Sequence, residues 1–240
     1  MHMLERSIKP ELLDELSPDD PRAMQSRRDL RRLNVWMGHN RIMQRMLEGA
    51  HRQSPPARII EFGAGDGTFL LRLAKSLPWR GGTIEAVLVD QQRLVSAKTQ
   101  AEFARISWKA IPIRSDVFEW LGRSELRPTD VIVANLFLHH FSNDALRTLF
   151  ARVAAQAACF VACEPRRSRP VWGMSKLVGL IGCNDVSRHD AAASVRAGFV
   201  GRELSALWPQ DDAWELTEKR AGLFSHSFVA RRLDATSGTR

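Results

Sequence analysis

The chain has 240 residues, of which 44% are hydrophobic and 26% charged, a composition typical of a folded globular protein and one that excludes an intrinsically disordered chain. Its formal net charge is +8, and because only 6 of the 35 basic residues are lysines, the excess is almost entirely arginine. No stretch approaches the roughly 20 apolar residues that a membrane-spanning helix needs, and no amino-terminal stretch has the apolar pattern of a signal peptide.

Residues 1–53 are predicted to form a strongly charged helical extension, or lid, ahead of a domain at 54–234. The sequence Ser-Pro-Asp-Asp-Pro at 17–21 indicates a turn and the start of a helix. Beyond it, apolar residues recur at helical spacings and leave the arginines on the other faces. These apolar residues are Met24, Leu30, Leu33, Ile42, Met43, Met46 and Leu47. The turn at 54–56 closes this region.

From Ala57 onward, short β-branched runs alternate with segments of helix length, which predicts a doubly wound α/β sheet built from parallel units. The expected strands are 57–62, 83–90, 106–113, 130–135 and 157–164, with helices that begin near residues 67, 91, 116 and 143. Residues 171–206 are expected to be a helical insertion on the acceptor side. Residues 215–219 and 223–231 are expected to form a final antiparallel pair of strands, and 235–240 a disordered tail.

The first strand runs into a glycine-rich turn, Glu-Phe-Gly-Ala-Gly-Asp-Gly at 61–67. Glycines suit a position where the chain turns sharply and a ligand approaches the backbone closely. A dinucleotide site has the spacing G-x-G-x-x-G, whereas here Thr68 occupies the sixth position and Gly67 comes one residue early. A carboxylate at Glu61 would repel a pyrophosphate but attract a cation. The turn therefore favours a positively charged ligand.

Acidic residues also follow the next two strands. Asp90 ends the second strand, where a carboxylate could accept hydrogen bonds from both ribose hydroxyls, and Asp116 follows the third, where it could accept one from an adenine amino group. Open α/β sheets bind their ligands at the carboxyl ends of the strands. Because Asp is also a common helix cap, capping is the alternative interpretation, especially for Asp116.

With these features the chain resembles the class I S-adenosylmethionine (SAM)-dependent methyltransferases, mainly over residues 57–165. It looks most like the small-molecule branch that includes the ubiquinone and menaquinone biosynthesis enzymes. The resemblance implies a Rossmann-like seven-stranded sheet of order 3-2-1-4-5-7-6 with the last strand antiparallel, and SAM as the cofactor. The cofactor residues that it implies are Glu61, Gly63, Ala64, Gly65, Asp66 and Gly67 at the amino-acid portion, Asp90 with Gln91 at the ribose, and Asp116 with Val117 at the adenine.

The fourth strand leads into Asn-Leu-Phe-Leu-His-His at 135–140, which resembles the family segment ending in Leu-His-His. The resemblance places Asn135 and Leu136 beside the methionine part of the cofactor. A phenol or enol acceptor must lose a proton, and a neutral histidine suits that task. We favour His139 as the base and keep His140 as a candidate, with Glu164 as the carboxylate partner of the imidazole. The alternative is that one histidine packs in the core and the other faces solvent.

The acceptor pocket is expected to be built by two flanking segments, one with Trp36 and His39 and the other with Trp172 and Met174. Their apolar character suits an apolar or aromatic acceptor, although simple packing on the sheet is the alternative. The Asn/Asp-Pro-Pro-Tyr signature of enzymes that methylate base amines and glutamine amides is missing.

We therefore expect a SAM-dependent methyltransferase for a small phenolic, polyketide-like or quinone-like acceptor, acting on oxygen in preference to carbon or nitrogen. We expect no bound metal, and a monomer or homodimer. The alternative is an RNA methyltransferase that uses the arginine clusters at 27–32 and 166–169, although solvated helix faces are the favoured explanation for them. A nucleotide-binding or NAD-linked protein is a third possibility, disfavoured by Glu61 and by the missing third glycine.

The number and spacing of the cysteines indicate the cellular compartment of the protein. They form no Cys-x-x-Cys pair and, being three, cannot all be cross-linked; they are Cys159, Cys163 and Cys183. Reduced thiols predict a cytoplasmic protein.

Overall fold

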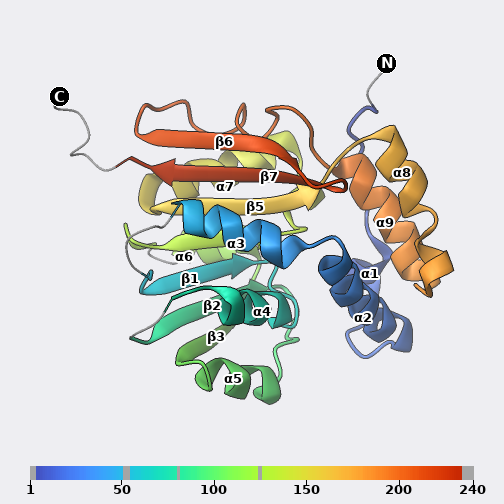
Figure 1. Ribbon diagram of the computed structural model, residues 1–240, viewed down its shortest axis with the longest axis horizontal. Coiled ribbons are helices and arrows are strands. Elements are labelled where there is room, and N and C mark those ends of the chain that lie inside the picture. Colours follow the sequence, from blue (N-terminus) through green and yellow to red (C-terminus); the bar gives the residue numbers. More distant parts are fainter. Residues whose placement is uncertain (1–3, 51–54, 80–81, 124–125, 234–240) are drawn as a thin grey trace.

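A seven-stranded sheet forms the centre of the molecule, with strand order β3-β2-β1-β4-β5-β7-β6 (Figure 1). The computed structural model describes residues 4–50, 55–79, 82–123 and 126–233. The strands are β1 (Arg58–Phe62), β2 (Ile84–Asp90), β3 (Trp108–Arg114), β4 (Val131–Asn135), β5 (Cys159–Pro165), β6 (Trp214–Ala221) and β7 (Ser225–Arg232). The first five strands are parallel, and β7 runs antiparallel to both β5 and β6. The predicted strand order and the antiparallel last strand are confirmed.

Helices cover both faces of the sheet and its carboxyl edge. They are α1 (Leu12–Glu15), α2 (Pro21–Trp36), α3 (His39–Ala50), α4 (Thr68–Ser76), α5 (Ala97–Ala104), α6 (Val117–Arg123), α7 (Asn143–Gln156), α8 (Arg169–Ser175) and α9 (Asp185–Ala197), with short 3₁₀ turns η1 (Leu138–His140) and η2 (Val178–Ile181). Helix α2 begins where the sequence predicts, because the Asp20 carboxylate accepts from the backbone N–H of Arg22 and Pro21 fills the first helical position.

Two apolar layers enclose the sheet. Ile60 and Phe62 of β1 face the layer that contains α6 and α7, whereas Ile59 faces the layer of α3, α4 and α5. This burial on both faces explains why the parallel strands are almost continuously hydrophobic. At the other end of the strands, Asp130 is fully buried and accepts two hydrogen bonds from the Arg58 guanidinium.

Two helix predictions are wrong. After β2, the helix begins at Ala97 instead of near residue 91, because the Asp90 carboxylate accepts from the N–H of Gln92 and holds the intervening loop at the sheet edge. The segment 171–206 is not helical beyond Ala197. A Cβ at Gly198 would lie 2.2 Å from the Pro165 carbonyl oxygen, and the chain there packs against the end of β5 before it turns. The predicted tail at 235–240 lies outside the described residues.

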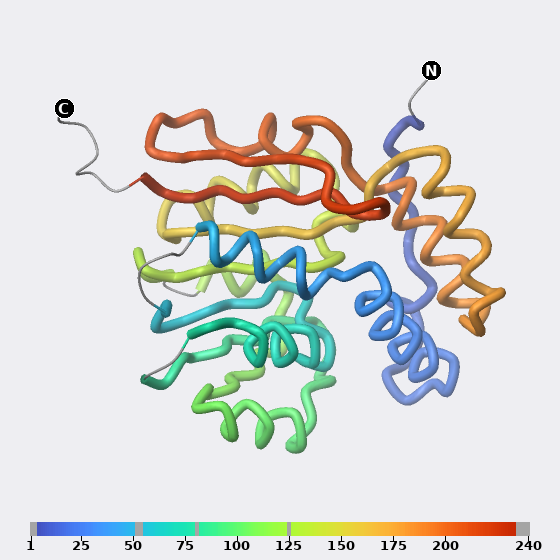
Figure 2. Tube along the Cα trace, viewed as in Figure 1, coloured from blue at the N-terminus to red at the C-terminus, as the bar shows by residue number. Residues whose placement is uncertain are grey.

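The amino-terminal segment crosses the carboxyl edge of the sheet and is tied to α9 (Figure 2). Arg6 donates to the carbonyls of Ala197 and Phe141, and the buried Asp190 carboxylate accepts from the backbone N–H groups of Leu12 and Leu13. Together with α2, α8, η2 and α9, this segment forms the layer that we call the lid, which consists of residues 4–36 and 169–197. Within the described ranges, no helix has the length and apolar character required to cross a membrane.

Candidate active site

A cavity of about 380 Å³ lies between the lid and the carboxyl ends of β1, β2 and β4. Its size falls in the range of roughly 300–1,000 Å³ that small-molecule and cofactor sites occupy. Strand ends and the glycine turn form one wall, and the lid and η1 form the other. The predicted cofactor residues that line it are Glu61, Gly63, Ala64, Gly65, Asp66, Asp90, Gln91, Val117, Asn135 and Leu136. Gly67 and Asp116 do not line it.

The glycine turn needs glycine at specific positions. Gly63 has φ +66°, and a Cβ there would lie 2.4 Å from a ring carbon of Phe137. Gly67 also has positive φ and ends the turn as the residue before α4. Gly65 differs because nothing lies within 4 Å of where its Cβ would be. The turn therefore leaves open space on the cavity side, where a ligand can reach the backbone.

Gly63→Ala and Gly65→Ala should separate these two roles. Both glycines have positive φ, so backbone strain affects both variants, and the clash with Phe137 should make Gly63→Ala the more destabilising change. We expect its free energy of unfolding to fall by about 1–3 kcal/mol and its Tm to lie about 2 °C or more below that of the wild type. Gly65→Ala should lower Tm less but weaken ligand binding about tenfold, because its methyl group would enter the cavity. Thermal unfolding and calorimetric titration would measure both effects. Equal Tm losses would contradict the assignment.

Glu61 is the most unusual ionisable group in the cavity wall. Its residue is 2% exposed, and its Oε2 has no hydrogen-bond partner among the described residues. Burial raises the pKa of Glu61 well above its ordinary value, and the nearby carboxylates Asp66 and Asp90 act in the same direction. A buried oxygen without a partner is costly, and a cationic ligand such as an ammonium group would satisfy it. The structure thus fits the cation predicted from the sequence.

Asp90 lies across the turn from Glu61. Its carboxylate accepts from the N–H groups of Gly65 and Gln92, each at 2.8 Å, so its position is fixed by the backbone. Burial raises its pKa, although these two hydrogen bonds oppose the shift. Each carboxylate oxygen retains a further lone pair for a ligand hydroxyl.

Asp116 is occupied by local contacts. Its Oδ1 accepts from the N–H groups of Phe118 and Glu119 at the start of α6, and its Oδ2 accepts from the Gln91 side chain at 3.0 Å. This geometry corresponds to the capping alternative, and Asp116 is not among the residues that line the cavity. An adenine amino group would have to share Oδ2 with the Gln91 side chain. The following residue, Val117, does line the cavity.

Asp66 points from the glycine turn toward the lid. It pairs with Arg31 of α2 at 2.5 Å and also accepts from Thr68. This ion pair fastens α2 over the turn that is expected to hold the amino-acid portion of the cofactor.

His139 is held between two carboxylates. Its Nδ1 donates to Glu164 at 2.8 Å, which is the pairing predicted from the sequence, and its Nε2 lies 3.2 Å from Glu11 of the lid. Burial alone would lower the pKa of His139, but the hydrogen bonds to Glu11 and Glu164 outweigh it and raise the pKa to about 9. His139 is therefore a cation at neutral pH with both ring nitrogens engaged. It has no free lone pair with which to accept a proton.

His140 has the opposite character. Burial and the neighbouring charge of His139, whose ring centroid is 4.3 Å away, lower its pKa to about 4. Its Nδ1 lies 3.5 Å from Asp14 of α1, and its side chain lines the cavity with 27% of its surface exposed. His140 is thus a neutral imidazole that faces the cavity.

The four residues expected to contact the acceptor do not line the cavity. Trp36 is 61% exposed and packs on Phe224 with ring centroids 4.8 Å apart. His39 is buried, where it donates to Asn135 at 2.9 Å and lies 2.8 Å from the Ser225 hydroxyl. Helix α8 buries Val171 and Ser175 and packs against α9, and neither Trp172 nor Met174 lines the cavity. Trp172 instead lies under the Lys176 ammonium, and Met174 is 39% exposed.

Two acidic residues of the lid that the sequence does not single out line the cavity beside the two histidines, namely Glu11 and Asp14. Ser194 also lines the cavity and donates to Glu11. Glu11 is 128 residues from His139 along the chain, and no local pattern distinguishes it from the other charged residues of the amino-terminal region.

The arginine clusters do not form one exposed strip. Arg167 is 5% exposed, donates to the carbonyls of Leu4 and Gly198, and pairs with Glu203. Arg31 is paired with Asp66. Each cluster therefore supplies hydrogen bonds and ion pairs that hold the lid in place, as well as solvated side chains.

The chain is similar to known methyltransferases in sequence pattern and in fold. The model of a family described as "Methyltransferase domain" matches residues 25–179, which is more than half of the chain. No curated protein matches the sequence. Among solved structures, the plantazolicin methyltransferase BpumL in complex with SAH is 13% identical, with a TM-score of 0.62 and coverage of 90% of this chain and 92% of that one.

Two other solved structures are similar to a comparable degree. The plantazolicin methyltransferase BamL, in complex with a triazolic desmethylPZN analog and SAH, is 13% identical with a TM-score of 0.60, covering 88% of this chain and 91% of that one. A putative O-methyltransferase from Nostoc punctiforme PCC 73102 is 13% identical with a TM-score of 0.57, and the match covers 95% of this chain and 64% of that one. At this level of identity, these structures establish the shared fold.

Proposed function

The chain belongs to the methyltransferase domain family, and we propose that it transfers the methyl group of SAM to a small phenolic, polyketide-like or quinone-like acceptor, preferentially at oxygen. The observation that carries this proposal is the buried, unpartnered oxygen of Glu61 in a cavity of cofactor size. That oxygen and the open space beside Gly65 match the ammonium and the amino-acid portion of SAM.

The chain's own residues account for binding and orientation of the donor. We propose that Glu61 accepts from the ammonium group, that Asp90 accepts from the ribose hydroxyls, and that Val117 packs near the adenine. Asn135 and Leu136 would flank the methionine portion at the end of β4. When bound, SAM supplies an electrophilic methyl group, and most of the rate enhancement comes from positioning the acceptor in line with it.

On the acceptor side, we propose His140 as the proton acceptor, in place of the favoured His139. Its neutral ring faces the cavity and lies beside the end of β4. His139, held by Glu11 and Glu164, is a positioning residue that keeps η1 in place and contributes a fixed positive charge near a developing phenolate. Transfer to carbon or nitrogen would use the same geometry with a different acceptor atom.

Binding of SAM should release a proton from Glu61. Burial raises the pKa of Glu61 in the free protein, and a bound ammonium group would lower it again, so binding releases a proton at any pH where the free carboxyl is protonated and the bound one is not. Affinity should therefore increase with pH until the raised pKa is passed. Calorimetry in buffers of different ionisation enthalpy should detect release of up to about one proton, and Glu61→Gln should abolish it. An identical proton count in wild type and variant would contradict the role of Glu61.

The proposed function is tested by donor binding and by methyl transfer. Mass spectrometry of the purified protein and calorimetric titration would detect SAM or SAH binding, and a metabolite screen with labelled SAM would identify the acceptor. Phenols, carbon acids and amines in one panel distinguish the acceptor atom. A protein that binds neither SAM nor SAH would refute the proposal, as would one that labels RNA and no small molecule.

A further inference from the structure

The outer side of the lid carries an exposed apolar ridge, which we define as Leu177, Leu180 and Ile181. Their exposed fractions are 56%, 83% and 50%, and they lie within five consecutive positions of the segment that joins α8 to α9. Isolated exposed apolar side chains are ordinary in folded proteins. A contiguous group on one projecting turn indicates an interaction surface.

The fold holds this ridge in place. Helix α8 ends at Ser175, the turn η2 follows, and Gly182 closes it with φ +80°. Arg32 of α2 donates to the Ile181 carbonyl at 2.7 Å, and Arg188 of α9 packs directly over Gly179. The apolar side chains are therefore presented outward by a turn that two helices support.

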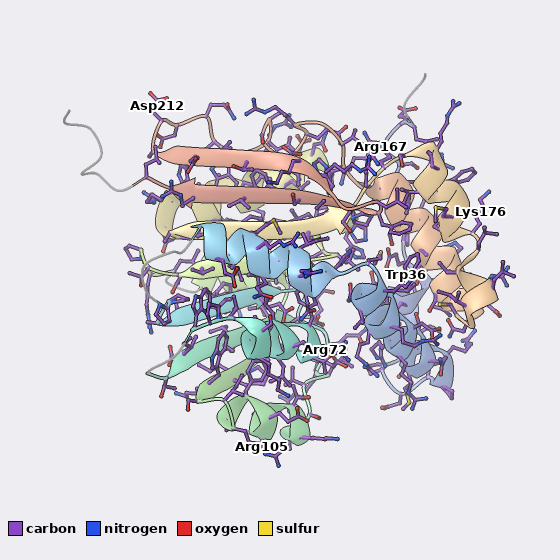
Figure 3. All side chains as sticks on the ribbon, in the orientation of Figure 1. Trp36, Arg72, Arg105, Arg167, Lys176 and Asp212 are labelled. Atoms are coloured by element: carbon purple, nitrogen blue, oxygen red, sulfur yellow. The ribbon has the colours of Figure 1, made fainter. Side chains whose placement is uncertain are left out.

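Basic side chains surround the ridge. Lys176, Arg32 and Arg188 are exposed beside it, and Figure 3 shows Lys176 at the outer edge of α8. Arg32 is ion-paired with Asp29, whereas no carboxylate of the described residues pairs with Lys176 or Arg188. Asp29 is fully buried and accepts from Arg32, the Asn184 N–H and the Ser187 hydroxyl. Asp185 lies near Arg22.

We infer that the apolar ridge and its two flanking cations without an acidic partner, Lys176 and Arg188, dock the protein onto an anionic lipid surface. Apolar side chains that enter the headgroup region, combined with cations that meet anionic lipids, are the features that hold a protein at a membrane interface without crossing it. The net charge of +8 favours the same partner. The inference rests on the proposed function in one respect: an apolar acceptor partitions into lipid, and docking by the lid would bring the cavity to it.

The lid connects the ridge to the cavity. Helix α2 supplies Arg31 to the cavity wall and Arg32 to the ridge, and α9 supplies Ser194 to the wall and Arg188 to the ridge. A surface that binds the ridge therefore contacts the same helices that enclose the acceptor site.

Vesicle flotation tests the inference with the full chain. Wild-type protein should float with vesicles of equimolar phosphatidylglycerol and phosphatidylcholine and should not float with phosphatidylcholine alone. Leu177→Ser/Leu180→Ser/Ile181→Ser should reduce binding about tenfold or more. Lys176→Glu/Arg188→Glu should reduce it to a similar degree while keeping all three apolar side chains. Binding should also weaken when NaCl is raised from about 0.05 to about 0.5 M.

Matched controls come from the opposite parts of the molecule. Leu233→Ser removes an apolar side chain of 40% exposure just after β7, and Arg105→Glu reverses an exposed charge just after α5. Both should bind vesicles as the wild type does. Circular dichroism and calorimetric titration with SAM on every variant show that the fold and the cofactor site are unchanged, and the single Leu180→Ser variant serves if the triple variant does not fold.

Three results would overturn the inference. The wild type would fail to float with anionic vesicles, or the ridge variants would float as well as the controls, or light scattering would show a dimer that only the ridge variants lose. In the last case the ridge binds a second copy. Failure of the proposed function has a separate signature, namely wild-type protein that does not bind SAM whatever its behaviour with vesicles.

Discussion

His140→Ala should lower turnover by about 100-fold or more and change the affinity for SAM by less than about twofold. The reason is that His140 is the neutral imidazole of the cavity wall, whereas His139 donates through one ring nitrogen and is bound to a second carboxylate through the other. Initial rates with the acceptor identified by the labelled screen, and calorimetric titration with SAM, would measure the two quantities separately.

His139→Ala and Glu11→Gln provide the comparison. His139→Ala should lower Tm, because it leaves the buried carboxylate of Glu164 without its imidazole partner. Glu11→Gln removes one of the two carboxylates that hold His139 in its charged form. If His140→Ala keeps full activity while His139→Ala loses it, and Glu11→Gln raises activity, then His139 is the base after all.

Asp90→Ala should weaken SAM binding by about 1.5–3 kcal/mol, which is about 10- to 150-fold in Kd. The side chain would no longer accept from the ribose, and it would also release the N–H groups of Gly65 and Gln92 that it now organises. Asp90→Asn should weaken SAM binding less than Asp90→Ala, because the amide oxygen still accepts from one of these two N–H groups. Calorimetric titration with SAM and with SAH measures both variants.

Asp116→Ala is the matched control for Asp90. It removes a carboxylate that follows the next strand but caps α6 and does not line the cavity, so it should cost about 1 kcal/mol of stability and change the affinity for SAM by less than about threefold. If Asp116→Ala weakens binding as much as Asp90→Ala, Asp116 binds the adenine in spite of its cap.

The sheet was predictable because its signals are local. Ile59 and Ile60 form a continuous apolar run that ends in a glycine turn, and this pattern requires a strand buried on both faces and followed by a helix. The position of Glu61 before the first glycine likewise follows from the sequence alone. Each of these features depends on neighbours a few residues away along the chain.

The acceptor side was less predictable because it depends on contacts between distant segments. Glu11 reaches His139 from a segment whose backbone is bound by Asp190 of α9, and neither residue has a distinguishing local pattern. The apolar spacing around Trp172 and Met174 suggested a pocket, but which side of a short helix is buried is decided by the partner against which it packs. Here that partner is α9.

The anchoring of residues 4–16 has a consequence for donor exchange under the proposed function. Arg6 is tied to the carbonyls of Ala197 and Phe141, and Glu11 lines the cavity beside His139, to which it is bound. If SAM enters and SAH leaves past this stretch, we expect residues 4–16 to detach in every cycle, and the rate of that detachment would limit turnover independently of how fast the methyl group moves.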